Sequence, residues 1–187
     1  MKPSFCSYAV LIAYFFIGSI HAQESKIIEI RQAGGSKQDQ QRFPGANILF
    51  KSQNKRVILF HEGALIESDQ AYFYSKRNSF KAMGEVVFTQ GDSLRMTCNT
   101  IEYDGETKTA LATGNVLLKR PDMTLETEIL NLDRVNDKAS YNTPGVIIDS
   151  SSTLTSNQGV YFMNQKKYRF ISDVTINNPE YIVNSQQ

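Results

Sequence analysis

The chain has 187 residues, with 20 lysines and arginines against 19 aspartates and glutamates. That length allows one domain with a sizeable core. The nearly neutral charge argues against non-specific nucleic-acid binding, which requires a basic surface, and the sequence has no basic stripe for anionic lipid headgroups.

The first 22 residues have the pattern of a secretory signal peptide. Lys2 precedes an apolar run over residues 8–17, and small residues lead to Ala22. The run is shorter than the ~20 apolar residues of a membrane span, so a cleaved leader at residues 1–22 is expected, with an uncleaved anchor as the alternative. No other apolar stretch of the sequence is long enough to cross a bilayer.

Of the two cysteines, only Cys98 lies outside the predicted leader. Cys6 precedes the apolar run, whereas a lipidated cysteine would follow it, so no lipoprotein is predicted. Removal of the leader also takes away Lys2 and leaves 19 basic and 19 acidic residues. An exported chain with a single thiol has no internal disulfide, so packing and ladder hydrogen bonds must stabilise it.

Beyond the leader, the composition changes twice. Residues 23–46 are polar, with Gly-Gly and Pro-Gly pairs, which predicts a mobile segment after a possible short strand at Lys26–Ile30. Residues 47–180 alternate short runs of Val, Ile, Tyr, Phe and Thr with turn signals, of which Asp104-Gly105 is a strong hairpin signal. The pattern predicts an all-β domain of strand-turn-strand units, with a tail at residues 181–187.

The β domain repeats itself. Four units can be laid over one another: residues 64–92, 93–122, 123–152 and 153–180. The anchor glycines of the first three units are spaced 30 and 31 residues apart, and an aspartate stands 28 residues further on in the fourth: Gly84, Gly114, Gly145 and Asp173. Since one hairpin cannot bury its apolar face alone, the period predicts stacked hairpins with a continuous apolar interior.

Alternation along each strand predicts which side chains face that interior. Thirteen of them form the predicted apolar face: Phe80, Ala82, Val86, Phe88, Leu94, Met96, Ala110, Ala112, Val116, Leu118, Met123, Leu125 and Ile147. After Cys98 and Thr127 the apolar positions shift by one residue, to Ile101 and Leu130. A β-bulge would produce this shift and would turn the strand into a second sheet.

Three stretches carry a resemblance to a known family. They read IESDQAYFY (Ile66–Tyr74), KAMGEVVFTQGD (Lys81–Asp92) and TIEYDGETKTALATGNVLLKRPD (Thr100–Asp122). These stretches resemble the OstA-like or LptA-like domain, most of all its Bacteroidetes versions, over about residues 65–180. The third and fourth units depart from the pattern, with Glu126-Thr-Glu128 in place of Ser/Ala-Asp and Asp173 in place of the glycine.

The resemblance implies a fold and a role. The fold is a twisted jellyroll of antiparallel strands whose two sheets form a V-shaped trough. The role is that of a periplasmic protein that shields the acyl chains of lipopolysaccharide, or lipid A, in the trough. Such domains stack end to end, so the implied protein partners are a second copy of the chain or the jellyroll domains of inner- and outer-membrane components. Neither a cofactor, nor a metal, nor nucleic acid, nor an enzymatic reaction is implied.

Two interpretations of the apolar face stay open at this point. Most apolar sheet faces are packed core, whereas the small residues Ala82, Ala110 and Ala112 leave room between sheets that acyl chains could fill. The resemblance favours the groove. The competing function is a structural domain with a filled core that docks partners by strand addition.

Strand addition requires open sheet edges. A stack of hairpins leaves unpaired edge strands at both ends, here expected near residues 47–60 and 168–176. The alternative is that the N-terminal segment and the C-terminal tail cover these edges.

Catalysis finds little support in the sequence. His61 is the only histidine outside the leader and precedes Glu62-Gly63, so an exposed histidine in a turn is expected. Cys98 has no evident base beside it in the sequence, and no Cys/His cluster has metal-ligand spacing. A small-molecule hydrolase that depends on His61 is therefore the third alternative.

Overall fold

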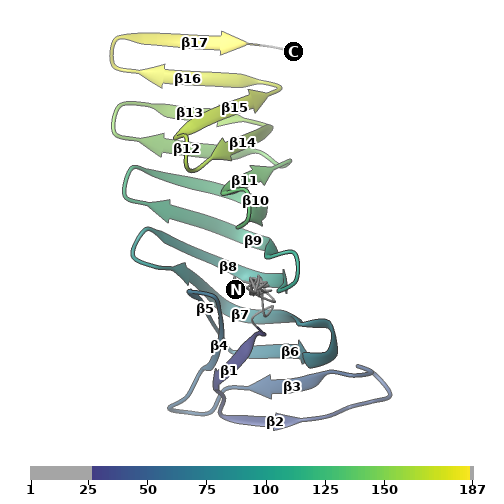
Figure 1. Ribbon diagram of the computed structural model, residues 1–187. Coiled ribbons are helices and arrows are strands. Elements are labelled where there is room, and N and C mark those ends of the chain that lie inside the picture. Colours follow the sequence, from purple (N-terminus) through teal and green to yellow (C-terminus); the bar gives the residue numbers. More distant parts are fainter. Residues whose placement is uncertain (1–26, 186–187) are drawn as a thin grey trace, which may run out of the picture.

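The computed structural model describes residues 27–185 as a column of antiparallel strands with one 3₁₀ turn, η1 (Ser75–Arg77) (Figure 1). The strands are β1 (Glu29–Gln32), β2 (Gly35–Lys37), β3 (Asn47–Phe50), β4 (Val57–His61), β5 (Ala64–Ser68), β6 (Gln70–Tyr74), β7 (Ser79–Gln90), β8 (Leu94–Asp104), β9 (Thr109–Arg120), β10 (Met123–Asp133), β11 (Lys138–Tyr141), β12 (Gly145–Asp149), β13 (Thr153–Ser156), β14 (Gln158–Phe162), β15 (Lys167–Ile171), β16 (Val174–Asn178) and β17 (Tyr181–Ser185). The predicted leader lies outside the described residues. Within residues 27–185, no helix has the length and apolarity that a membrane span needs.

The strand pairing forms two sheets that share four long strands. Strands β7 to β10 are 11 or 12 residues long, and each contributes one half to either sheet. The first sheet runs in the order β2–β3–β6–β7–β8–β9–β10–β11–β14–β15. The second runs in the order β1–β4–β5–β7–β8–β9–β10–β12–β13–β16–β17. The two sheets therefore face each other across one interior, as a jellyroll requires.

The long strands pass from one sheet to the other at bulges, as the shift of the apolar positions predicts. The register shifts between Met83 and Val86 in β7, between Thr97 and Thr100 in β8, and between Thr127 and Ile129 in β10. We call this row of crossing points, residues 83–86, 97–100, 113–116 and 127–129, the spine.

Left-handed backbone geometry allows the turn at the spine. Gly84 and Gly114 have φ values of 81° and 80°, and each is followed by a second residue with positive φ, Glu85 or Asn115. A Cβ atom on Gly84 would lie 2.7 Å from the Cβ atom of Asp69, so space as well as φ excludes a side chain there. The first two anchor glycines of the repeat thus have a backbone role.

The last two units reach the same crossing in different ways. Gly145 has no positive φ, and the strand is instead interrupted at residues 142–144, which include Pro144 and precede β12. In the fourth unit Ser172 and Asp173 have φ values of 65° and 49°, so the left-handed pair persists without a glycine. Ser172 therefore takes the place of the glycine, and Asp173 takes that of Glu85 and Asn115, one residue later than the sequence alignment assigned it.

Opposite the spine, the turns of the two sheets meet. The first rim consists of the first-sheet turns at residues 75–78, 105–108, 134–137 and 163–166. The second rim consists of the second-sheet turns at residues 62–63, 91–93, 121–122 and 150–152. We call the line along which the two rims approach each other the seam.

The β structure extends beyond the predicted domain limits of residues 47–180. Strands β1 and β2 lie in the segment 23–46 that was expected to be mobile, and β17 lies in the expected tail at 181–187. Ile28 and Ala46 are buried, so the segment before residue 47 contributes to the core. Strand β1 overlaps the possible short strand expected at Lys26–Ile30, whereas β2 was missed because it reads Gly-Ser-Lys, which has no apolar alternation.

The predicted positions of the sheet edges also need correction. Strands β3 and β4, near residues 47–60, are each paired on both sides, and the N-terminal edges are β1 and β2. At the other end β15 is an edge strand, as expected, but β16 is covered by β17.

Candidate functional site

The interior between the sheets is continuous and apolar. All thirteen side chains of the predicted apolar face are buried, with exposed fractions of at most 5%. They join further interior side chains from β4, β5, β8, β10 and β14, among them Leu59, Ile66, Ile101, Leu130 and Tyr161. Because these groups are shielded from water on both sheets, the N-terminal and central parts of the interior are filled by side chains of the described chain.

One polar cluster lies at the edge of this apolar interior. His61 ends β4 with only 1% of its surface exposed, and its Nδ1 atom lies 2.8 Å from the hydroxyl oxygen of Tyr103. The expectation of an exposed turn histidine is thus wrong, because the left-handed turn begins only at Glu62 (φ 45°). Burial raises the pKa of the Tyr103 phenol, and Arg134 opposes that shift. The His61–Tyr103 pair links the second sheet to the first.

Arg134 holds the same cluster from the rim. Its guanidinium donates to the hydroxyl of Tyr103 at 2.6 Å, to the carbonyl of Glu62 at 2.8 Å and to the side-chain oxygen of Gln90 at 2.9 Å. A longer contact of 3.4 Å reaches the carbonyl of His61. Sequence reasoning missed Arg134, since it sits among turn residues and its acceptors lie more than 30 residues away along the chain.

Two ion pairs also cross the seam. Lys108 Nζ lies 2.6 Å from Glu62 Oε2, with both side chains two-thirds or more shielded. Nearer the C-terminal end, Lys166 Nζ lies 3.7 Å from Asp122 Oδ2, and the Lys166 side chain is 72% exposed. The seam is therefore held tightly near Glu62 and loosely near Asp122.

The interior opens at the C-terminal end. From β10 onward the first sheet adds β11, β14 and β15, whereas the second adds β12, β13, β16 and β17, so the second sheet projects one strand further. Pairing with Leu154 and Ile176 places Val183 on the inner face of β17, where it is 45% exposed. Tyr168 and Phe170 line the opposite sheet and are only partly buried. We call this uncovered apolar end the mouth.

Aromatic rings lead from the mouth inward. The rings of Tyr168 and Phe170 are stacked at 5.7 Å between centroids, and those of Tyr161 and Tyr168 at 4.8 Å. Tyr161 is fully buried, so the series runs from the partly exposed mouth to the closed interior. None of these residues was in the predicted apolar face, because the fourth unit matches the repeat only weakly.

Comparison with known proteins identifies the family and the fold of this chain. A family model described as OstA-like protein matches residues 25–186. The chain belongs to the OstA-like family. A solved structure with a similar fold is LptH of Pseudomonas aeruginosa, described as the LptA-homologous periplasmic component of the conserved lipopolysaccharide transport device. The TM-score is 0.54 at 20% identity, over 66% of this chain and 94% of that chain. The fold is thus the LptA-like β-jellyroll, as the resemblance implied, and no curated protein sequence matches the chain.

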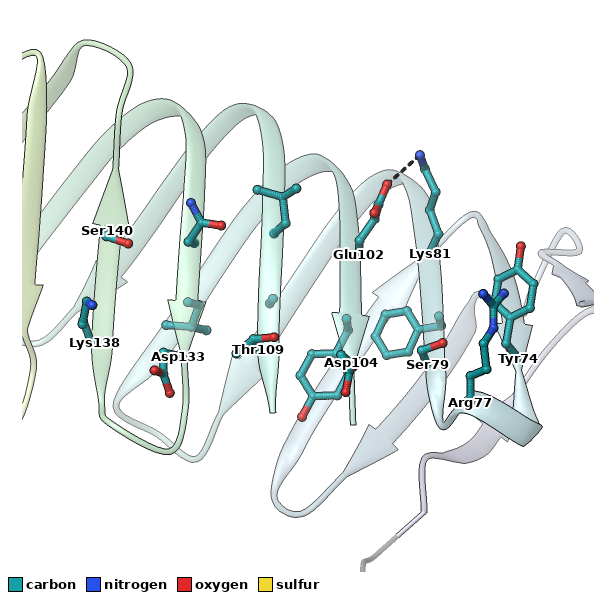
Figure 2. Close-up of a pocket in the computed structure, with 16 residues that line it drawn as sticks. Tyr74, Arg77, Ser79, Lys81, Glu102, Asp104, Thr109, Asp133, Lys138 and Ser140 are labelled. Carbon is teal, nitrogen blue, oxygen red and sulfur yellow. Dashed lines mark hydrogen bonds and ion pairs between the residues drawn. The ribbon is translucent and has the colours of Figure 1, made fainter. Parts of the chain in front are cut away.

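The outer face of this OstA-like chain also carries a groove. It has a volume of about 700 Å³ and runs across the first sheet beside the first rim (Figure 2). Its side chains come from successive strands, with Lys81 and Glu102 paired at 2.9 Å and Ser140 at one end. Only Phe80 and Ala110 of the predicted apolar face contribute to its lining. The groove has a mixed lining, in which the core residues Phe80, Tyr103, Ala110 and Leu132 lie beside polar side chains of the first sheet.

Cys98 is a structural residue of the OstA-like chain. The thiol is buried, and that burial raises its pKa from 9.0 to about 12, against a smaller lowering by the backbone of Thr113. A thiol with so high a pKa has almost no thiolate at neutral pH and is a poor nucleophile. Within residues 27–185 no group of three or more His, Cys, Asp and Glu side chains is arranged to hold a metal ion.

Proposed function

We propose that this OstA-like chain is a lipopolysaccharide-transport-type protein that binds the acyl chains of its ligand between its two sheets. The observation that carries the proposal is an apolar interior that is continuous through the column and uncovered at the mouth, where Val183 is 45% exposed. Support comes from LptH, which has the same fold and is described as part of a lipopolysaccharide transport device. On the same grounds we propose that the protein is periplasmic.

Acyl chains would first contact the mouth and then the predicted apolar face. Each methylene group removed from water contributes about 0.8 kcal/mol, so a few groups covered by Phe170, Ile176 and Val183 already give measurable binding. Residues further in, such as Leu118 and Met96, are buried in the absence of ligand. A chain that reaches them must push the two sheets apart.

The edges suit assembly with other jellyroll domains. Strands β15 and β17 end the two sheets at the mouth, and β1 and β2 end them at the opposite end of the column (Figure 1). Unpaired edges of this kind bind a further strand through main-chain hydrogen bonds. We propose that the chain extends in this way, by pairing with a second copy or with a related jellyroll domain.

One observation favours the competing function. The thirteen side chains of the predicted apolar face leave no more than 5% of their surface exposed, as in a filled core. A filled core predicts a structural domain whose only binding surfaces are its edges. The two functions differ in whether apolar ligands are bound.

The test compares two neighbouring residues on β17. Val183→Asp places a charge on the inner face of the mouth, and Ile182→Asp places the same charge on the outer face, where Ile182 is 66% exposed. Binding of fluorescently labelled lipopolysaccharide is measured by anisotropy. We expect Val183→Asp to weaken binding about tenfold or more, because the acyl chain would desolvate the new charge. Ile182→Asp should leave binding within about twofold of the unmodified protein. Equal effects of the two variants, or no binding by the unmodified protein, would contradict it.

A further inference from the structure

The two sheets are joined differently on their two long sides. Along the spine, β7 to β10 pass covalently from one sheet to the other through bulges with left-handed residues such as Gly84 and Gly114. Along the seam, only side-chain and main-chain contacts hold the rims together. A movement that parts the rims therefore needs rotation at the spine and the loss of the seam contacts, while the sheet ladders stay intact.

Arg134 makes most of the strong contacts in the central part of the seam. It projects from the first rim, and three of its four acceptors belong to the second sheet or its rim: the carbonyls of His61 and Glu62 and the side chain of Gln90. The fourth, the hydroxyl of Tyr103, also contacts His61. Removing this one side chain thus breaks several cross-seam hydrogen bonds at once.

The seam contacts weaken from Arg134 toward the mouth. On the mouth side of Arg134, the Arg120 guanidinium lies 6.0 Å from the ring centroid of Tyr161 across the seam, and the Lys166–Asp122 pair is 3.7 Å long, with the Lys166 side chain exposed. On the other side of Arg134, toward β1, the amide of Ile28 donates to Oδ1 of Asn78 at 2.8 Å in a buried contact. An apolar chain that enters at the mouth therefore meets weaker seam contacts before it reaches Arg134, although it must still part the sheets around buried side chains such as Leu118.

We propose that Arg134 holds this seam closed and sets how far an apolar chain can enter the interior. We call its set of cross-seam hydrogen bonds the latch. With the latch closed, the chain is confined to the mouth and its aromatic lining. When the latch releases, the rims part about the spine, and the N-terminal half of the interior, around Ile66, Phe88 and Met96, becomes accessible. The closing of the seam by Arg134 stands on the contacts alone, and only the lipid nature of the ligand rests on the proposed function.

The test uses Arg134→Gln and a matched control, Arg169→Gln. Arg169 is an exposed arginine on β15, so the control makes the same change of charge away from the seam. Hydrogen–deuterium exchange is measured in the turns at residues 61–64 and 134–137. Uptake of the apolar dye N-phenyl-1-naphthylamine is followed by fluorescence. We expect Arg134→Gln to speed exchange in both turns about tenfold or more, as the loss of hydrogen bonds to a charged group predicts, and to increase dye uptake. Arg169→Gln should match the unmodified protein in both readouts.

A second, milder variant distinguishes local opening of the seam from general unfolding of the protein. Tyr103→Phe keeps the ring that stacks on Phe80 at 5.3 Å and removes only the hydroxyl that bonds Arg134 and His61. It should show a smaller change in the same two turns, with exchange in β8 and β9 unchanged. Unchanged exchange in both variants would overturn the latch. Faster exchange without added dye uptake would overturn its control of access. Failure of lipopolysaccharide binding together with increased dye uptake in Arg134→Gln would refute the proposed ligand while leaving the latch in place.

Discussion

The ring of Tyr141 occupies the space that the absent side chains of Gly145 and Gly159 leave open. A Cβ atom on Gly145 would lie 2.5 Å from Cε2 of Tyr141, and one on Gly159 would lie 2.5 Å from its Cζ. The Tyr141 hydroxyl also hydrogen-bonds the hydroxyl of Ser156 at 2.7 Å. The third anchor glycine of the repeat is thus required by a neighbouring ring and not by its own backbone conformation.

This relationship predicts the effect of Gly145→Ala. The added methyl group collides with the Tyr141 ring, and overpacking of this kind costs about 1–3 kcal/mol of unfolding free energy. Urea denaturation of Gly145→Ala, Tyr141→Leu and the double variant measures the coupling. If the collision is the cause, Gly145→Ala costs almost nothing in the Tyr141→Leu background. Strict additivity of the two changes would disprove the explanation.

Gly84→Ala should be more harmful than Gly45→Ala. Both glycines have positive φ, 81° and 77°, so both substitutions incur a backbone cost of about 1–2 kcal/mol. Only Gly84 also faces Asp69 at 2.7 Å, whereas nothing lies within 4 Å of a Cβ atom on Gly45. Chemical denaturation gives both costs, and the difference isolates the close approach at the spine. A larger cost at Gly45 would show that space at the spine is not limiting.

The raised pKa of the Cys98 thiol predicts that the folded protein loses stability at alkaline pH. Its folded pKa is about 12 against an ordinary value of 9.0, so the unfolded chain loses the thiol proton first. The contribution is fully present below about pH 9 and is lost as the pH rises toward 12, by at most about 1.4 kcal/mol per pH unit. The buried phenols of Tyr103 and Tyr141, whose pKa values are also raised by burial, add to the loss at higher pH.

Melting curves between pH 7 and pH 10 test this effect. Cys98→Ala removes the thiol, so its melting temperature should fall less steeply between pH 9 and pH 10 than that of the unmodified protein, whatever its absolute stability. The same burial predicts that a thiol reagent modifies Cys98 only after denaturant is added. Parallel pH slopes of the two proteins would rule out the thiol as the source.

Edge pairing predicts assembly that depends on β17. Lysines blunt edge strands, because a partner strand would bring their charges close to its own side chains. The double variant Ile182→Lys and Asn184→Lys should therefore shift light-scattering masses toward the monomer at concentrations where the unmodified protein associates. Both positions lie on the outer face, so the mouth stays apolar. A mass that is monomeric for both proteins at every concentration would remove the case for self-assembly.

The repeat and its two-residue alternation predicted the stacked hairpins, the interior face and the bulges, because burial on one side of each strand imposes that alternation. Residues such as Leu118 and Leu125 could therefore be placed from the sequence. The polar edge strand β2 could not, since its pairing comes from neighbouring backbone and not from side chains.

The contacts across the seam could not be predicted from the sequence either. Arg134 and Glu62 are turn residues 72 positions apart, and nothing local to either indicates that two rims meet there. The burial of His61 also depends on that meeting, because its partner Tyr103 comes from the opposite sheet. Contacts between turns that lie far apart along the chain leave no periodic signal in the sequence.

The most direct test of acyl-chain binding is native mass spectrometry of the protein purified from its host, with lipid extraction of the same sample. Acyl-chain binding between the sheets predicts a bound mass that the extraction identifies as lipopolysaccharide or lipid A. A protein that is free of lipid, and that stays free when lipopolysaccharide is offered, would contradict it. The interior would then be a filled core, and docking through the edge strands would be the function.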